Sequence, residues 1–190
     1  LSEKVGTGGQ LRLKAIVVRK KGEDDLVKRA SLLRKDSVHG NIAGTVDVDH
    51  ENNRLLVNGN AIQVIYANHP SEIDYTAYDI QDALIIDNMG IWKDREALSQ
   101  HFEATGASQV LLTAPAGDDI ANVVYGINHK GVDIDNETIF SAASCTTNCI
   151  APILKLVEDN YGITDGHIET IHAYTNDQNL IDNFHKKARR

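Results

Sequence analysis

The sequence predicts an α/β protein with a parallel sheet whose strands are joined by crossover helices. Short apolar segments typical of strands alternate with segments of helical spacing between residues 11 and 112. This alternation is typical of a parallel sheet. The pattern changes near residue 144, where a hydroxyl-rich run leads into a long amphipathic segment. We therefore predict two domains, at residues 1–144 and 145–190.

The first part of the chain is predicted to contain a strand, a helix and two hairpins. Residues 11–18 form an apolar run typical of a strand, and apolar residues recur at helical spacing over residues 24–35. Three short alternating segments follow at residues 45–49, 54–57 and 60–67. Asn58 and Gly59, between the last two, form a strong hairpin turn, so this part is an antiparallel insertion.

The rest of the first domain returns to the pattern of strand and helix. Residues 83–86 and 109–112 are apolar runs that predict buried strands. A helix is expected between them, over residues 94–104. We expect Gly106 to end it, because glycine readily adopts the left-handed conformation that caps a helix.

A helix and a strand are predicted after Cys145. Five apolar residues fall on one helical face, namely Ile150, Ile153, Leu154, Val157 and Tyr161. Pro152 lacks an N–H and crowds the preceding turn, so either the first turn is irregular or the regular helix begins late. Residues 167–175 alternate apolar and polar side chains, which predicts a strand.

The composition is that of an ordinary globular protein, with 24% charged and 42% hydrophobic residues. The net charge of −8 argues against binding to nucleic acid or to an anionic membrane as the main function. A local basic cluster (Lys186, Lys187, Arg189 and Arg190) still permits a small anionic ligand. Two cysteines are too few for a disulfide framework, which favours a reducing, cytoplasmic compartment.

Neither a membrane span nor a signal peptide is visible in the sequence. No apolar run approaches the roughly 20 residues that a membrane-spanning helix needs. We therefore expect neither a membrane nor nucleic acid as a partner. The chain begins at Leu1 and stops at Arg190 within a basic polar segment, so we expect it to be part of a longer protein.

Cys145 is the strongest candidate for a catalytic residue. It lies among Ser144, Thr146, Thr147 and Asn148, which are typical of a helix start and unfavourable in a core. The N–H groups and positive dipole end of a helix lower the pKa of a thiol and can hold an oxyanion. The alternative is a small buried hydrophobic residue, which is the commoner role of an isolated cysteine.

The other cysteine and the histidines are weaker candidates. Cys149 adjoins the apolar helical face, which favours a structural role, and two cysteines without paired histidines do not predict a zinc site. His172 is a candidate base for Cys145, although a histidine at the end of a strand can also be structural. His167 lies five residues before His172, so on a strand the two point to opposite faces and cannot bind one ion.

Two loops follow predicted strands and are candidates for ligand binding. Thr113 opens a run of small residues, and Gly90 lies in the turn after residues 83–86. Such loops at the carboxyl edge of a parallel sheet bind nucleotides in many proteins, but each is equally typical of a plain turn. The sequence contains no G-x-G-x-x-G phosphate motif.

Five short runs, spread over nearly the whole chain, point to one family. Residues 141–149 read SAASCTTNC and residues 172–178 read HAYTNDQ. The other three runs lie at residues 36–40, 114–119 and 126–129. In this order, they closely resemble the motifs of phosphorylating glyceraldehyde-3-phosphate dehydrogenases, where the first run carries the nucleophile and the second the base.

The resemblance implies a Rossmann-type parallel sheet, here truncated at its N-terminus, followed by the start of an α+β catalytic domain. It implies a homotetramer when full length, and NAD or NADP as cofactor. The implied reaction converts glyceraldehyde 3-phosphate and inorganic phosphate to 1,3-bisphosphoglycerate, in glycolysis or gluconeogenesis. Cys145 would form a hemithioacetal and then a thioester, with His172 as the base. Without the family's first strand and later catalytic segments, the 190-residue chain is expected to be inactive and to bind dinucleotide poorly.

The resemblance also implies binding residues. Phosphate groups are expected at or beside Ser144, Thr146, Thr175, Asp177 and Arg190. Cofactor contacts are expected at Arg19, Gly90 and Thr113. The family usually places an aspartate on the adenosine ribose after the second strand, but residues 18–21 read VRKK here. A cation there can pair with a 2′-phosphate, so we expect the full-length enzyme to accept or prefer NADP.

Two other functions stay open. Erythrose-4-phosphate dehydrogenases share the nucleophile motif, although the intact run HAYTND favours the triose enzyme. A non-catalytic homologue with a binding or regulatory role would keep the motif by inheritance. Thiol alkylation separates the last possibility, because a catalytic Cys145 reacts at neutral pH far faster than Cys149.

Overall fold

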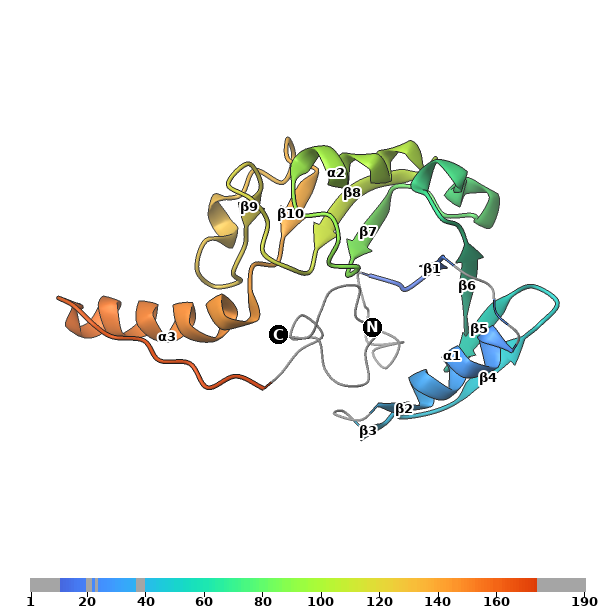
Figure 1. The fold of residues 1–190 in the computed structure, drawn as a ribbon, viewed down its shortest axis with the longest axis horizontal. Coiled ribbons are helices and arrows are strands. Elements are labelled where there is room, and N and C mark those ends of the chain that lie inside the picture. The colour runs from blue at the N-terminus through green and yellow to red at the C-terminus, as the bar shows by residue number, and fades with distance from the viewer. Residues whose placement is uncertain (1–10, 20–21, 23, 37–39, 174–190) are drawn as a thin grey trace, which may run out of the picture. The chain divides into compact units, whose positions relative to one another are not determined.

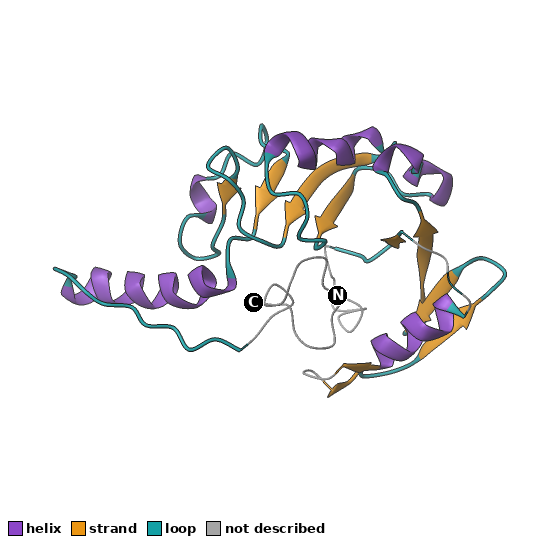
Figure 2. Ribbon diagram, viewed as in Figure 1, coloured by secondary structure: helices purple, strands orange, loops and turns teal. Residues whose placement is uncertain are grey.

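The computed structural model describes residues 11–19, 22, 24–36 and 40–173, and the chain divides into two compact units, Leu1–Pro152 and Ile153–Arg190. Figure 1 traces the elements along the chain, and Figure 2 separates helices from strands. All described strands lie in the first unit. The α/β class predicted from the sequence is confirmed.

One sheet is mixed and contains the predicted hairpins. Its strands, in spatial order, are β1 (Ala15–Val18), β6 (Asn60–Tyr66), β5 (Arg54–Val57) and β4 (Val46–Asp49). β1 and β6 are parallel, whereas β5 pairs antiparallel with both β6 and β4. Asn58 and Gly59 have φ values of 50° and 78°, as a tight two-residue hairpin turn requires. The antiparallel insertion is therefore confirmed.

A helix packs on this sheet. α1 (Asp25–Arg34) confirms the helix predicted after the first strand, and its Leu26 and Ala30 are buried with residues of β4, β5 and β6. The first strand is shorter than predicted. Its pairing with β6 starts only at Ala15, which lies opposite Gln63.

The second sheet is entirely parallel. Its strands, in spatial order, are β7 (Ala83–Asp87), β8 (Ala107–Leu112), β10 (Ile139–Ser141) and β9 (Ala121–Asn122). Figure 1 shows β7, β8 and β10 side by side with their arrows in one direction. Leu98, from α2 (Arg95–Ser99), is fully buried against this sheet with Val110, Leu112 and Ile139. The buried strands predicted at 83–86 and 109–112 are confirmed.

The helix predicted over residues 94–104 differs from the structure in form. α2 has five residues and continues as a 3₁₀ helix, η4 (Gln100–Glu103). Gly106 does not cap this helix, although its φ is 93°. It opens the turn into β8, where a Cβ would come within 2.9 Å of the Ile80 carbonyl oxygen. The glycine is therefore required by a close backbone approach.

The two sheets do not join into one among the described strands. β1 and β7 are edge strands, and both line a cavity of about 670 Å³ in the first unit. The remaining short elements are β2 (Lys35–Asp36), β3 (Gly40–Asn41), η2 (Pro70–Glu72), η3 (Tyr75–Tyr78) and η5 (His129–Gly131). A single parallel sheet was predicted, and the described residues supply no strand between β1 and β7.

The last helix begins earlier than predicted. α3 (Cys145–Tyr161) is continuous, so both alternatives derived from Pro152 are wrong. Pro152 lies inside the helix and has no N–H to donate to the Asn148 carbonyl oxygen, so the helix continues with one backbone hydrogen bond fewer. No residue of α3 is buried, and Cys149 is exposed, which corrects the predicted structural burial of its thiol. The apolar face of α3 is uncovered within the described part of the chain, so it does not enclose Cys149.

The strand predicted after α3 is wrong over residues 167–173, which have no regular secondary structure. Alternating side chains stabilise a strand only where a neighbouring strand supplies backbone hydrogen bonds. No described strand pairs with this segment. Residues 174–175 lie outside the described residues. None of the described helices combines the length and apolar content required to cross a membrane.

Candidate active site

Cys145 lies where a parallel strand feeds a helix. β10 ends at Ser141, and α3 starts at Cys145 after the three-residue link 142–144. The carboxyl ends of parallel strands are where open α/β sheets bind their ligands. The thiol is exposed, so the structure places Cys145 at an accessible position on that edge.

Ser144 caps the helix that Cys145 begins. Its Oγ accepts a hydrogen bond from the Thr147 backbone N–H at 2.9 Å, and the two hydroxyl oxygens lie 2.6 Å apart. This bond satisfies one of the N–H groups that a helix start leaves open. Ser144 and Thr146, both predicted to bind phosphate, thus flank Cys145 on the first turn.

A shallow hollow lies beside this turn. It has a volume of about 400 Å³, and its lining includes Ser144 and Thr147 from the helix start, Asn122 from β9 and Asn128 from the loop after β9. The hollow therefore presents hydroxyl and carboxamide groups next to the residues that precede Cys145.

The three predicted cofactor residues lie at the carboxyl ends of β1, β7 and β8. The Arg19 guanidinium contacts Met89 Sδ at 3.5 Å, which brings the end of β1 to the turn that contains Gly90. Thr113 donates from its backbone N–H and its hydroxyl to the Asp87 carbonyl oxygen, at 2.9 and 3.2 Å. Arg19, Gly90 and Thr113 therefore belong to neighbouring strand ends, although their contacts with a cofactor stay a prediction.

These residues fit a dinucleotide. Arg19 offers a cation for a phosphate, and Gly90, with φ of 68°, has open space around its Cα. The cavity of about 670 Å³ reaches the same strand ends and is lined there by Arg19, Asn68 and Asn88. A groove with a guanidinium and carboxamides suits an anionic, hydrogen-bonding ligand.

A buried hydrogen-bonded pair, Asp87 and His101, lies next to the turn that contains Gly90 and was not predicted from the sequence. Asp87 Oδ2 lies 2.9 Å from His101 Nε2, and Asp87 Oδ1 accepts the Met89 N–H at 2.8 Å. Burial opposes ionisation of Asp87, but the hydrogen bonds from His101 and Met89 outweigh it and lower its pKa. The Trp92 ring packs edge-on against His101 at 5.0 Å between centroids. The one signal for this pair in the sequence is an aspartate, Asp87, at the end of an apolar strand.

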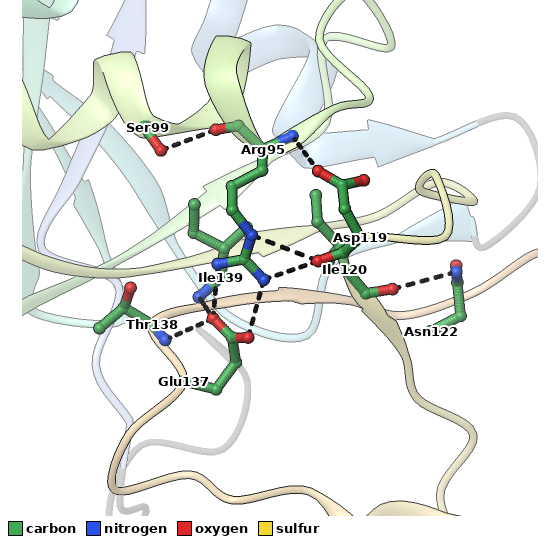
Figure 3. A network of polar contacts seen from close by, with 8 residues as sticks. All are labelled: Arg95, Ser99, Asp119, Ile120, Asn122, Glu137, Thr138 and Ile139. Atoms are coloured by element: carbon green, nitrogen blue, oxygen red, sulfur yellow. Dashed lines mark hydrogen bonds and ion pairs between the residues drawn. The ribbon is translucent and has the colours of Figure 1, made fainter.

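A second missed network joins α2 to the strands. Figure 3 shows Arg95 paired with Glu137 through two hydrogen bonds of 2.9 and 2.8 Å, while it also donates to the Asp119 carbonyl oxygen at 2.7 Å. The Arg95 hydrogen bonds lower the pKa of Glu137 to about 2. This network holds the loop after β8 against the start of β10, the strand that leads to Cys145.

His172 lies in the second unit. It is exposed, its Nδ1 contacts the Ala173 carbonyl oxygen, and it belongs to no strand. Cys145 belongs to the first unit, so the pairing of thiol and imidazole stays a prediction. Three predicted phosphate residues, Thr175, Asp177 and Arg190, lie outside the described residues. Among the residues that the structure describes, no group of His, Cys, Asp and Glu is arranged to hold a metal ion.

Two domain models of one family match this chain. Residues 9–95 match the NAD binding domain of glyceraldehyde 3-phosphate dehydrogenase, and residues 144–190 match the C-terminal domain of the same enzyme. The first match, which covers the first sheet and β7, confirms that this part of the chain belongs to an NAD-binding domain of the Rossmann type. The cofactor class that it implies is a nicotinamide dinucleotide, NAD or NADP.

Curated relatives agree with these matches. The chain is 60% identical, over all 190 residues, to a glyceraldehyde-3-phosphate dehydrogenase-like protein of Pseudomonas aeruginosa strain UCBPP-PA14, and covers 41% of that protein. It is 38% identical over 161 residues to glyceraldehyde-3-phosphate dehydrogenase 1 of Bacillus subtilis strain 168, which is 85% of the chain and 47% of the relative. For glyceraldehyde-3-phosphate dehydrogenase of Streptococcus pyogenes the identity is 40% over 157 residues, 83% of the chain and 45% of the relative. The chain thus spans less than half the length of these relatives. By both domain matches and these identities, the chain belongs to the glyceraldehyde-3-phosphate dehydrogenase family.

Proposed function

We propose that the full-length protein oxidises glyceraldehyde 3-phosphate, with inorganic phosphate and NAD or NADP, to 1,3-bisphosphoglycerate. The observation that carries this proposal is the exposed Cys145 thiol on the first residue of α3, at the carboxyl edge of the sheet. Unpaired N–H groups at a helix start favour the thiolate over the thiol. Family membership supplies the substrate class.

The proposed chemistry begins with attack of the Cys145 thiolate on the aldehyde carbon, which gives a hemithioacetal. His172 accepts the hydroxyl proton as hydride leaves that carbon, and a thioester remains on Cys145. NAD or NADP, when bound, accepts the hydride. Inorganic phosphate then attacks the thioester carbon, the C–S bond breaks, and the acyl phosphate leaves with the thiolate restored.

We propose two sets of binding residues. For the cofactor they are Arg19, Gly90 and Thr113. For the phosphate groups they are Ser144, Thr146, Thr175, Asp177 and Arg190. Two of the latter, Ser144 and Thr146, are supported by their position on either side of Cys145, with the hollow of about 400 Å³ beside Ser144. Hydroxyl and N–H donors on one helix turn suit an oxyanion.

We further propose a homotetramer in the cytoplasm and a domain boundary between residues 144 and 145. The boundary is supported by the C-terminal family match, which begins at residue 144. The tetramer and the location rest on family membership alone.

Substitution at the two cysteines of the full-length protein tests the proposal. Cys145→Ala is expected to abolish turnover of glyceraldehyde 3-phosphate. Cys149→Ala is the matched control, because this exposed thiol lies one turn along the same helix, and it should leave turnover unchanged. Iodoacetamide at neutral pH should label Cys145 far faster than Cys149. Equal, slow labelling of both thiols would overturn the proposal and favour a non-catalytic role.

A further inference from the structure

The link that leads into Cys145 contains a residue in an unusual conformation. Ala143 has φ of 58°, in the left-handed region, and is 7% exposed. The other non-glycine residues with positive φ in the described part of the chain are Asp24, Asn53, Asn58, Asp79 and Asp82. Asparagine and aspartate tolerate this region because their side chains form local hydrogen bonds, whereas the Cβ of alanine is strained there. Something outside Ala143 must therefore hold it there.

Ser141 is the group that holds it. Its side chain is fully buried, and its Oγ accepts the Ala143 backbone N–H at 3.0 Å. The same Oγ lies 2.7 Å from the Ala114 carbonyl oxygen and 2.8 Å from Asn122 Oδ1. The hydroxyl thus accepts from the link, and its one hydrogen faces Ala114 in the loop after β8 and Asn122 in β9, so it ties the link to these residues.

Asn122 fixes the position of Ser141 in turn. Its Oδ1 also accepts the Ala116 N–H at 3.0 Å, and its Nδ2 donates to the carbonyl oxygens of Ala116 and Ile120. Figure 3 shows that Asn122 adjoins the network of Arg95, which holds the neighbouring Asp119 carbonyl oxygen. The serine is therefore anchored on a loop that is itself bonded to α2.

The link is held from its other side by Asn148. The Asn148 Nδ2 donates to the carbonyl oxygens of Ala142 and Ser144, at 2.7 and 2.9 Å. Both hydrogen bonds and the Ser141 contact act on residues 142–144. The conformation of this link determines the direction in which α3 starts, and with it the position of the Cys145 thiol.

We propose that Ser141 is a positioning residue for Cys145: its buried hydroxyl holds Ala143 in the left-handed conformation that sets the thiol for attack on the substrate carbonyl. This role rests on the proposed function. Ser141 touches no reacting atom and acts through the link alone.

The test compares Ser141→Ala with Ser108→Ala in the full-length protein. Ser108 is the matched control, because its hydroxyl donates to the Ala83 carbonyl oxygen on the neighbouring strand and does not contact the link. The rate of iodoacetamide labelling is measured for Cys145 and Cys149 across a pH series, with each peptide quantified by mass spectrometry. Ser141→Ala should slow labelling of Cys145 about tenfold at neutral pH, as expected for the loss of a buried hydrogen bond. Labelling of Cys149, and both rates in Ser108→Ala, should stay unchanged.

A rescue variant separates positioning from simple destabilisation. Glycine adopts positive φ at no steric cost, so Ser141→Ala with Ala143→Gly should recover part of the lost Cys145 labelling rate. In steady state, Ser141→Ala should lower kcat and leave the KM for the dinucleotide unchanged. If Ser141→Ala fails to fold, Asn148→Ala serves instead, because this exposed side chain donates hydrogen bonds to the same link. Its loss should slow Cys145 labelling in the same way.

The outcomes distinguish this inference from the proposed function. Fast labelling of Cys145 that is the same in the unsubstituted protein, Ser141→Ala and Asn148→Ala would overturn the positioning role and leave the proposed function standing. Slow labelling of Cys145, equal to that of Cys149, in the unsubstituted protein would overturn the proposed function itself.

Discussion

Arg19 is the residue on which we predict that the choice between NAD and NADP depends. It follows β1, and its guanidinium reaches the Met89 side chain in the turn after β7. A ribose that lies between these strand ends would present its hydroxyls to a cation. Lys20 and Lys21, the next two residues, lie outside the described residues. Arginine is well suited to this role because its planar fork binds phosphate through two hydrogen bonds.

Arg19→Ala in the full-length protein should therefore weaken the binding of NADP more than that of NAD. The loss of one charge-assisted contact to the 2′-phosphate predicts an increase in the Kd for NADP of about tenfold. NAD, which lacks that phosphate, is the internal control. Isothermal titration of both cofactors measures the two constants. A clear preference of the unsubstituted protein for NAD would contradict this prediction.

His101 should contribute strongly to stability through Asp87. His101→Phe leaves the buried Asp87 carboxylate without its main partner, so we expect the free energy of unfolding to fall by about 3 kcal/mol. His101→Gln, which retains a hydrogen-bond donor, should cost less, and His50→Gln at an exposed position should cost little. The pKa of Asp87 is lowered, so its stabilisation is present at neutral pH and is lost as the pH falls through its folded-state pKa. Urea unfolding at pH 7 measures these differences; equal stability of the Phe and Gln variants would argue against the pair.

At the scale of elements, the Arg95 network fastens α2 to β10. Arg95 contributes two nitrogens to Glu137, and the Glu137 carboxylate also accepts the N–H groups of Thr138 and Ile139. The helix start and the strand start are thus joined through one carboxylate. Because Arg95 is partly exposed, solvent screens this pair and limits its contribution to stability.

Glu137→Gln should lower the free energy of unfolding at pH 7 by about 1 kcal/mol. The pKa of Glu137 is lowered to about 2, so its stabilisation is complete above its ordinary value near 4.5 and is lost as the pH falls from there toward 2. The difference between Glu137→Gln and the unsubstituted protein should therefore shrink in acid. Glu96→Gln, an exposed change on α2, is the control. A difference that stayed constant down to pH 3 would exclude this carboxylate as its cause.

Local patterns predicted most elements of the first unit. The periodic apolar positions of α1, the runs of β7 and β8 and the Asn58–Gly59 turn are set by neighbours in sequence, and all three were found. Pro152 does not delay or interrupt α3 as predicted, because a proline removes one backbone hydrogen bond and the helix continues on both sides of it. The strand predicted over residues 167–173 is absent because alternating side chains also need a neighbouring strand to supply backbone hydrogen bonds.

The sequence singled out Cys145 as a candidate, but it did not indicate the residues that hold Cys145 in place. Cys145 stood out because hydroxyl residues surround it, and that signal is local. Ser141 depends on Ala114 and Asn122, which are 27 and 19 residues away in sequence. Asp87 meets His101 across 14 residues. The spacing of apolar residues along the sequence does not predict such contacts, because they form only when segments that are distant in sequence come together.

At the scale of the whole molecule, the described strands do not form one continuous sheet. β1 and β7 leave an edge each on the cavity of about 670 Å³, and the chain spans less than half of its relatives' length. Edge strands expose backbone groups that are otherwise paired. No described strand links β1 to β7, so the strand ends that are proposed to bind the cofactor are held relative to one another by side-chain packing and by the contact of Arg19 with Met89.

The 190-residue chain alone should thus bind a nicotinamide dinucleotide far more weakly than the full-length protein. Binding needs the ends of β1, β7 and β8 at a fixed spacing, and the apparent affinity falls with the fraction of molecules in which this spacing is not kept. Titration of both proteins with NAD and NADP gives the comparison. Equal affinity would show that the two sheets are sufficient by themselves.

The hairpin turn at Asn58 and Gly59 has a consequence for the chemical ageing of the protein. An asparagine before glycine is prone to deamidation, because the glycine nitrogen can attack the side-chain carboxamide without steric hindrance. Here Asn58 Oδ1 accepts the Thr45 N–H, and Nδ2 donates to the Ala43 carbonyl oxygen, at 2.9 and 3.1 Å. These bonds hold the carboxamide away from the attack geometry in the folded chain. Conversion of Asn58 to aspartate or isoaspartate should therefore accumulate with the time that the protein has spent unfolded.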